Sequence, residues 1–515
     1  MPSLVTDNFR VFAAEQFIES LAEPFDSSNN PEADSSSAAQ NYRSKVYLFI
    51  GRSQNWTLEK YSGQSAVTEF APPDVQDSFN DSNEIYDDMI AVKRINSTDV
   101  SKVIKRITWK SGVKYDMYKN DYTSTNLSLN GHSNLYDSQS YVVNSNFQVY
   151  KCIYNGISPT HQQGRASTVE PTGTATSIIE SAADGYRWKY LYTINISDYI
   201  RFVSSDFMPV RVDSTVAAAA VDGSVEQLII ENRGTGNANN TTYYCPIVGD
   251  GTTDAIAKIV TNASGGIQTV ESERVGAGYT RAKVILTEAY TTLGNALSRS
   301  GTTATLSGTV STVISPPGGH GSNPPLELGG YRVMINKSLE FLDGDGDIPV
   351  NSQFRRFGLL SDPKNVSNTD LIVDTATACF AAKFPAATTV NFDIGEIITQ
   401  ASTGAKGRVI HWDSITKVLR YYQNEHIDET QSGQKQYKLI PFSGSNAITG
   451  ATSGVTATPD TTASGTGSFF GVTFTTGYSS PEVKKNSGTI IYVENRKAVN
   501  RSTDQTEDIK LVVEF

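Results

Sequence analysis

The amino-acid sequence predicts a mainly β protein of the α+β class. We expect an antiparallel β-sandwich-like core with a few peripheral helices and two inserted all-β domains. The chain holds 40 glycines, 25 tyrosines and 21 phenylalanines among many serines, threonines and asparagines, which is typical of short strands joined by turns. Leucine, methionine, lysine and glutamate, which favour helices, are sparse. A length of 515 residues further predicts about two to four folding units rather than one.

The N-terminal region shows one clear helix signal followed by strand signals. Thr6 or Asp7 can cap the helix, because the next apolar side chains recur with helical i, i+3, i+4, i+7 spacing at Ala14, Phe17, Ile18 and Leu21. Further along we expect a polar loop over residues 25–41, a buried strand Val46–Ile50, a short helix Glu84–Met89, a strand Ala91–Ile95, and short strands alternating with turns over Tyr115–Tyr192.

Residues 213–325 repeat themselves, which predicts an inserted domain of similar stacked units. Three glycine pairs, Gly234/Gly236, Gly276/Gly278 and Gly319/Gly321, recur 42 and 43 residues apart. Each follows a strand-like run: Gln227–Glu231, Gln268–Glu271 or Thr312–Ile314. We interpret the pairs as turns that need positive φ or a close backbone approach. A phosphate-binding loop is the alternative, but no phosphate-loop frame follows the glycines.

Residues 371–480 contain a second duplication. The segments Phe392–Asp413 and Phe442–Asp460 share a Phe, an Ile-Thr pair, an Ala-Ser/Thr-x-Gly turn and a final Asp. Two similar hairpins in a small barrel or sandwich would explain this. The predicted domains are therefore an N-terminal core part (1–212), a Gly-rich insertion (213–325), a core return segment (326–370), a duplicated insertion (371–480) and C-terminal core strands (481–515).

Composition excludes several classes of protein. A net charge of −11 and a pI of about 5.1 argue against a general nucleic-acid binder, which needs a basic face. Three cysteines are too few for a disulfide framework, and Cys152 and Cys379 have apolar neighbours typical of buried thiols. No run approaches the roughly 18 apolar residues of a membrane span. The first residues lack the pattern of a secretory signal.

No motif in the sequence predicts catalysis. Asp343, Asp345 and Asp347 resemble the start of a calcium loop, but Ile348 replaces its glycine and Phe354 its bidentate glutamate, so an exposed turn is the better interpretation. The five histidines are scattered without ligand spacing. No nucleophile elbow, zinc-protease motif or Cys/His couple with an orienting partner is present. We therefore expect no enzyme, no catalytic residue, no metal site and no cofactor.

The last 28 residues combine two strand signals with a polar segment. Thr489–Val493 and Ile509–Phe515 are rich in β-branched and aromatic residues, and we expect a polar loop between them. The chain ends on an aromatic residue, as a terminus tied into a sheet does.

This C-terminal segment closely resembles the baseplate wedge subunit family of T-even-type contractile-tail phages, the gene-eight product family. The resemblance rests on Ile491, Tyr492, Glu494, Asn495, Arg496, Asp504, Gln505, Thr506, Glu507 and Phe515. Segments in the same order elsewhere also resemble the family: Phe49, Gly51, Arg52, Ser53 and Trp56; Phe70–Pro73; Val149–Cys152; Asp184–Leu191; and Phe354–Arg355 with Asp362–Pro363. It covers roughly residues 1–212, a short middle piece and the last 35 residues. The family's short members lack both insertions.

The resemblance implies a structural protein of the virion tail, made in the host cytoplasm. Such a subunit would form a homodimer in each wedge of a sixfold baseplate, contact neighbouring wedge proteins, and take part in assembly, host attachment and tail contraction. The residues it suggests for the dimer or partner surface are Tyr186, Trp188, Tyr190, Glu494, Arg496, Arg501 and Glu507. Aromatic residues of Asp184–Tyr192 are, on general grounds, more often core than interface.

A carbohydrate-binding adhesin or tail-fibre-like host-recognition protein is the alternative from another class. Repeated Gly-rich β units with surface tyrosines and Trp412 would suit it. The two functions can coexist if a wedge core carries insertions that bind host surface glycans. A glycan-cleaving enzyme is a third possibility, because paired carboxylates cannot be recognised from sequence.

Overall fold

A computed structural model confirms the predicted fold class, with 39% of residues in strands and 10% in helices. The structure describes residues 4–21, 45–57, 63, 65–294, 299–340, 348–423, 426–428, 436–465, 472–502 and 505–515. The chain divides into two compact units. Unit 1 comprises residues 1–15, 101–334 and 514–515, and unit 2 comprises residues 16–100 and 335–513. The aspartates of the suspected calcium loop lie outside the described residues.

Four elements contribute residues to both units, because the chain passes between the units within them. They are helix α1 (Asp7–Ser20) and strands β3 (Val100–Lys105), β17 (Arg332–Leu339) and β30 (Glu507–Glu514). The predicted N-terminal helix is thus confirmed as α1, and the Oγ1 atom of Thr6 accepts a hydrogen bond from the Phe9 amide at 3.3 Å. Of its predicted apolar face, Ala14 and Leu21 are buried.

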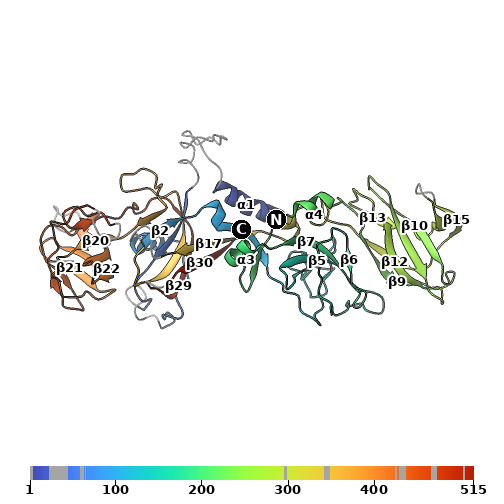
Figure 1. Cartoon of the computed structure of the whole chain (residues 1–515), viewed down its shortest axis with the longest axis horizontal. Coiled ribbons are helices and arrows are strands. Elements are labelled where there is room, and N and C mark those ends of the chain that lie inside the picture. Colours follow the sequence, from blue (N-terminus) through green and yellow to red (C-terminus); the bar gives the residue numbers. More distant parts are fainter. Residues whose placement is uncertain are drawn as a thin grey trace. The chain divides into compact units, whose positions relative to one another are not determined.

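A four-stranded antiparallel sheet forms the centre of unit 1 (Figure 1). Its order is β4 (Tyr141–Val143), β5 (Gln148–Asn155), β7 (Tyr186–Thr193) and β6 (Ile179–Glu180). Because side chains alternate along a strand, the sheet has two apolar faces. Trp188 and Tyr190 pack on one face, and Leu191 packs on the other. Nearby elements of unit 1 are α3 (Ile196–Phe202) and β8 (Phe207–Pro209), which pairs with β3.

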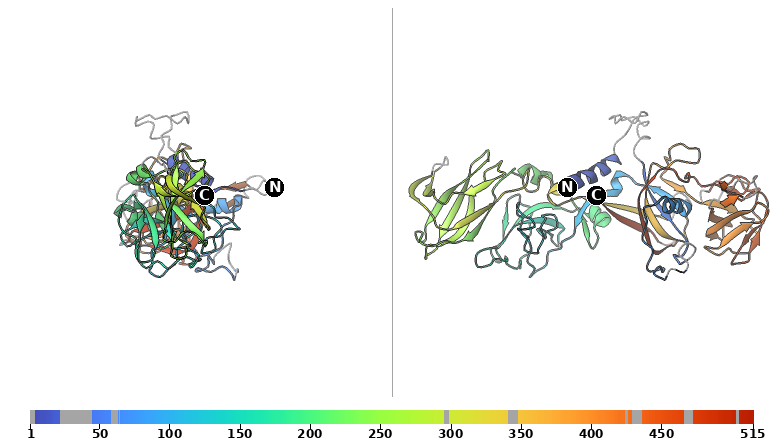
Figure 2. Two further views of the ribbon diagram at one scale, coloured as in Figure 1. Left: turned by 90° about the vertical axis from the view of Figure 1, so that its right-hand side faces the viewer. Right: turned by 180° about the vertical axis from the view of Figure 1, so that it is seen from behind.

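The Gly-rich insertion folds as β strands with a core of their own. Its largest sheet has the order β12-β11-β10-β14-β15, with β13 on β10, and β16 pairs with β9. Val216, Ile229 and Val313 also pack in the core that holds Trp188, so the block adjoins the central sheet, as Figures 1 and 2 show. The elements are α4 (Ser214–Ala219), β9 (Gln227–Asn232), β10 (Thr242–Gly249), β11 (Ala255–Thr261), β12 (Ile267–Arg274), β13 (Ala282–Val284), β14 (Ala289–Leu293), β15 (Arg299–Ala304), β16 (Thr309–Val313) and α5 (Pro324–Glu327).

The glycine pairs behave as predicted. The three strand-like runs lie in or overlap β9, β12 and β16, and all six glycines have positive φ, between 61° and 87°. A Cβ on Gly234 would overlap the Ser307 carbonyl, whereas a Cβ on Gly236 would meet nothing within 4 Å. The first glycine of this pair therefore serves a close backbone approach and the second serves only the turn.

Unit 2 is built on a five-stranded antiparallel sheet with the order β19-β2-β1-β18-β29 (Figure 1). All six residues of β1 are buried, which confirms the predicted strand Val46–Ile50. The helix predicted at Glu84–Met89 is displaced: Ser78 caps α2 early, and Met89 instead opens β2. The elements are β1 (Val46–Gly51), α2 (Phe79–Asp87), β2 (Met89–Arg94), a 3₁₀ turn (Ser97–Asp99), β18 (Ser352–Ser361), β19 (Thr375–Thr377) and β29 (Thr489–Arg501).

The prediction of a polar loop after Val493 is largely wrong, because β29 continues to Arg501. It pairs with β18 from Ser361 opposite Thr489 to Ser352 opposite Arg501, with two irregularities in the register along the way. The ladder supplies backbone hydrogen bonds whatever the side chains are, and so overrides the polar composition.

The second insertion forms a seven-stranded sheet in unit 2, with a large buried cluster and a smaller one beside it. Both halves of the duplication contribute equivalent buried residues, Phe392 with Phe442 and Ile398 with Ile448. Their hairpins, β21–β22 and β26–β27, join through β21 and β26. The elements are β20 (Phe380–Lys383), β21 (Ile397–Gln400), β22 (Ala405–Asp413), β23 (Val418–Tyr422), β24 (His426–Asp428), β25 (Gln436–Lys438), β26 (Ile448–Gly450), β27 (Thr456–Ala457) and β28 (Tyr478–Ser479).

In the part of the chain that the structure describes, every helix is too short or too polar to cross a bilayer.

Candidate functional site

A buried network of charged side chains lies in unit 2, where β1, β2 and β18 meet. The Asp88 carboxylate accepts hydrogen bonds from Nη1 of Arg356 at 3.0 and 2.9 Å, and Nη1 of Arg52 lies 3.8 Å from it. All three side chains are less than one-tenth exposed. Burial raises the pKa of the Asp88 carboxyl, and the charges of Arg356 and Arg52 oppose that rise. Removing the Asp88 carboxylate would leave the two buried guanidinium groups without its compensating charge.

The C-terminal strand β29 enters this network through its backbone and one amide. Oδ1 of Asn495 accepts a hydrogen bond from Nε of Arg356 at 2.9 Å, and its Nδ2 donates to the Pro73 carbonyl at 3.0 Å. The indole of the fully buried Trp56 donates to the Arg496 carbonyl at 2.6 Å. Segments that are hundreds of residues apart in the sequence are thereby fixed to one another.

Arg355, the neighbour of Arg356 on β18, is also buried. Its Nε donates to Glu69 at 2.5 Å and its Nη1 to the Ser53 carbonyl at 2.5 Å. Neighbouring strand residues normally face opposite sides, so this residue holds a second set of segments. The ladder with β29 is irregular between Phe354 and Arg356, as a β-bulge is.

The buried network gathers segments on which the family resemblance rests. These are the Phe49–Trp56 region, Phe70–Pro73, Phe354–Arg355 and Glu494–Arg496, with Glu69 directly before the second. Two further segments that resemble the family lie side by side in unit 1, where β5 and β7 place Cys152 opposite Trp188. Among the described residues, no group of three or more His, Cys, Asp or Glu side chains could hold a metal ion.

The aromatic residues suggested for a partner surface lie inside unit 1. Tyr186, Trp188 and Tyr190 are at most 3% exposed, and Tyr186 stacks on Trp188 with ring centroids 5.3 Å apart. They therefore offer almost no surface to a partner in this conformation. Asp184, just before them, accepts backbone hydrogen bonds from Thr168 and Tyr186, and such bonds lower its pKa although burial opposes this.

The four charged residues suggested near the C-terminus lie in unit 2 as two pairs. Arg501 has a fully buried side chain and lies 3.2 Å from Glu507. Arg496 is half exposed, and its Nε donates to Glu494 at 2.5 Å. Of these four residues, therefore, only Glu494 and Arg496 present charge at the surface.

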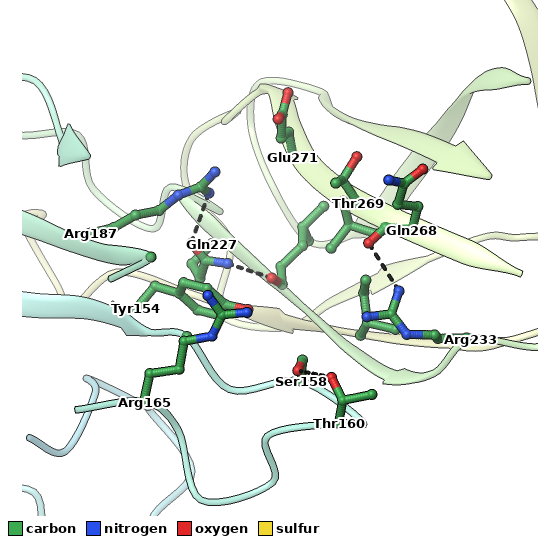
Figure 3. Close-up of a pocket in the computed structure, with 15 residues that line it drawn as sticks. Tyr154, Ser158, Thr160, Arg165, Arg187, Gln227, Arg233, Gln268, Thr269 and Glu271 are labelled. Carbon is green, nitrogen blue, oxygen red and sulfur yellow. Dashed lines mark hydrogen bonds between the residues drawn. The ribbon is translucent and has the colours of Figure 1, made fainter. Parts of the chain in front are cut away.

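A cleft in unit 1, shown in Figure 3, was missed in the sequence analysis. Its volume is about 260 Å³, and it lies between the β5–β7 sheet and strands β9 and β12. Arg165, Arg187 and Arg233 reach into it from three separate segments. No motif links these arginines in the sequence. Their clustering in an acidic chain emerges only from the tertiary fold.

A second polar cluster in unit 1 joins the third glycine pair to β5. Nδ1 of His320 lies 2.6 Å from Glu327, whose other oxygen accepts from the Gly321 amide at 2.8 Å. Lys151 is buried beside Ser140, with Nζ and Oγ 3.0 Å apart. Burial lowers the pKa of Lys151 to about 8, although Glu327 opposes the shift.

In comparisons with known proteins, neither a family model nor a curated protein matches this chain.

Proposed function

We propose that this chain is a structural subunit of a contractile-tail baseplate wedge. The observation that carries the proposal is the buried network around Asp88. The sequence segments that resemble the wedge family are distant along the chain, yet they hydrogen-bond to one another in unit 2. Because these segments contact one another in the fold, they form one structural unit. This supports a shared ancestry of the core with that family.

The proposed mechanism is packing and not covalent chemistry. The network fixes the C-terminal strand β29 against β18 and the Trp56 segment, so that unit 2 presents a rigid surface. A wedge subunit needs such rigidity, because it holds its neighbours in one arrangement until the baseplate changes state. The exposed Glu494–Arg496 pair is the part of the predicted partner surface that a neighbour could reach.

The proposal includes a homodimer and stable contacts with other wedge proteins. Static light scattering of the purified chain should give twice its 55.9 kDa mass, as a closed symmetric contact would. Co-expression with the adjacent genes should give a complex that survives purification by a tag on this chain. A monomer that co-purifies with none of those products would contradict the proposal.

Carbohydrate binding is the second candidate function, and the cleft of Figure 3 is the observation that favours it. Hydroxyl and amide side chains at its rim, including Ser158, Thr160 and Gln268, are groups that bind sugar hydroxyls. Binding of neutral or charged glycans on an array would support this function. It would not oppose the wedge proposal, because the cleft lies in unit 1 and the network in unit 2.

A further inference from the structure

The cleft of Figure 3 carries an excess of positive charge in a chain whose net charge is −11. Three arginines line it, and Glu271 is the acidic residue among the lining side chains. Glu271 is exposed and lies 3.8 Å from Lys258. Arg187 also has an acidic neighbour, Glu180, at 3.1 Å. In an acidic protein this local concentration of guanidinium groups needs a physical reason.

Two of the arginines are held in place by the fold. Nη1 of Arg187 donates to Oε1 of Gln227 at 3.1 Å. Nη1 of Arg233 donates to the carbonyls of Ile267 and Gln268 at 2.7 and 3.1 Å. Each guanidinium has five N–H donors, so these bonds orient the groups and leave further donors for a ligand.

Arg165 is the third arginine, and two glycines make room for it. A Cβ on Gly156 would come within 3.0 Å of its side chain, and a Cβ on Gly185 would lie 3.6 Å from Nη1. Its own side chain is exposed and has no ion-pair partner within the described residues. Its charge is therefore available to a ligand that enters the cleft.

The positive charges of the three arginines all act on the side chain of Tyr154. Burial raises the pKa of Tyr154, whereas Arg187, Arg165 and Arg233 each lower it. All three guanidinium groups thus lie within electrostatic reach of the Tyr154 hydroxyl, which donates to the Ile157 carbonyl at 2.5 Å. An anion placed beside Tyr154 would be attracted by all of them at once.

We propose that this cleft binds an oxyanion, namely a phosphate group that is free or carried by a small saccharide. Planar guanidinium groups suit the geometry of phosphate oxygens, and the hydroxyl and amide rim suits a sugar. The volume of about 260 Å³ is just below the usual range of ligand pockets and limits the bound part to a small group.

The test is isothermal titration of the full chain in phosphate-free buffer with inorganic phosphate, glucose 6-phosphate and glucose. We expect both phosphates to bind, with an affinity that falls as sodium chloride is added. Tighter binding of the sugar phosphate would identify a phosphorylated saccharide as the preferred source, whereas equal binding would identify the phosphate alone. If glucose binds as tightly as glucose 6-phosphate, the proposal is overturned and the carbohydrate-binding function remains.

Variants then locate the site. Arg165→Gln should weaken phosphate binding about tenfold or more, because it removes charge-assisted hydrogen bonds. Arg165→Lys should weaken it less. Arg274→Gln is the matched control, since Arg274 is also exposed in unit 1 but does not line the cleft. Equal affinities for Arg165→Gln and Arg274→Gln, with unchanged melting curves, would overturn the proposal. None of these readouts depends on wedge assembly.

Discussion

The indole nitrogen of Trp56 donates a 2.6 Å hydrogen bond to the backbone carbonyl of Arg496, a residue 440 positions further along the chain. Trp56 is fully buried, and the guanidinium of Arg52 lies 4.3 Å from the centre of its ring. One side chain thus joins the N-terminal part of unit 2 to the C-terminal strand.

Replacing Trp56 by Phe should destabilise the protein by about 1–3 kcal/mol, because the indole donor is lost and the Arg496 carbonyl loses its partner. Urea denaturation gives the free energy of unfolding. Trp412→Phe is the matched control: its indole donates to Asn391 at an exposed position, where water can take over the bond. If the two variants lose equal stability, the Trp56 bond does not have the role given to it here.

The Gly234/Gly236 pair offers a test within one turn. Both glycines have positive φ, so alanine at either position should cost about 1–2 kcal/mol. Gly234→Ala should cost a further ~1–3 kcal/mol, because its new methyl group would overlap the Ser307 carbonyl. Urea denaturation of the two variants measures the difference, and a Gly236→Ala variant as unstable as Gly234→Ala would refute the close approach.

His411 predicts a specific pH dependence of stability. Burial, aided by the charge of Arg420 and opposed by Asp413, lowers its pKa from 6.5 to about 4. The unfolded chain therefore binds a proton first, so stability is lost as the pH falls from 6.5 towards 4, by roughly 3 kcal/mol from this group.

His411→Gln should remove that share of the pH dependence, measured as unfolding free energies at pH 7 and pH 4. His161→Gln, at an exposed position, is the control and should keep the full dependence. A His411→Gln variant whose stability falls as steeply as that of the parent would show that His411 is not the group responsible.

The second insertion should be removable at ends that are already paired. Ala381 lies opposite Ser479 in the β20–β28 ladder, so their Cα atoms are close, as in any antiparallel pair. Deleting residues 381–479 and inserting a short Gly/Ser linker should leave unit 2 folded, because Glu482 still bonds to Thr377.

The wider deletion of residues 371–480 is the comparison. It also removes β19, which pairs with β2, together with the core residues Leu371 and Ala376. We expect this variant to be much less stable than the shorter deletion or insoluble, as judged by thermal unfolding. Equal stability of both deletions would mean that β19 contributes little to unit 2.

The sequence predicts best those elements that local chemistry decides. The helix after Thr6, the buried strand at Val46 and the positive-φ glycines follow from capping, burial pattern and turn chemistry. The extension of β29 to Arg501 could not be predicted in this way, because its partner strand β18 lies in a distant part of the chain.

The sites depend even more on tertiary structure. Arg165 lies in a loop, Arg187 in β7 and Arg233 directly after β9, and only the packing of the Gly-rich block on the central sheet brings them together. The burial of Arg501 is likewise decided by the packing around it, which no local pattern in the sequence encodes. The burial of Tyr186, in contrast, agrees with the general tendency of aromatic strand residues to lie in a core.

The central claim is that this chain is a wedge subunit, and imaging of the co-expressed complex tests it most directly. The chain should be expressed with its neighbouring genes, purified by its own tag and examined by electron microscopy with a label on the same chain. The account predicts wedge-shaped particles that assemble around a sixfold axis, with two labels in each wedge. Particles that lack the label, or a labelled chain that stays outside every assembly, would contradict it.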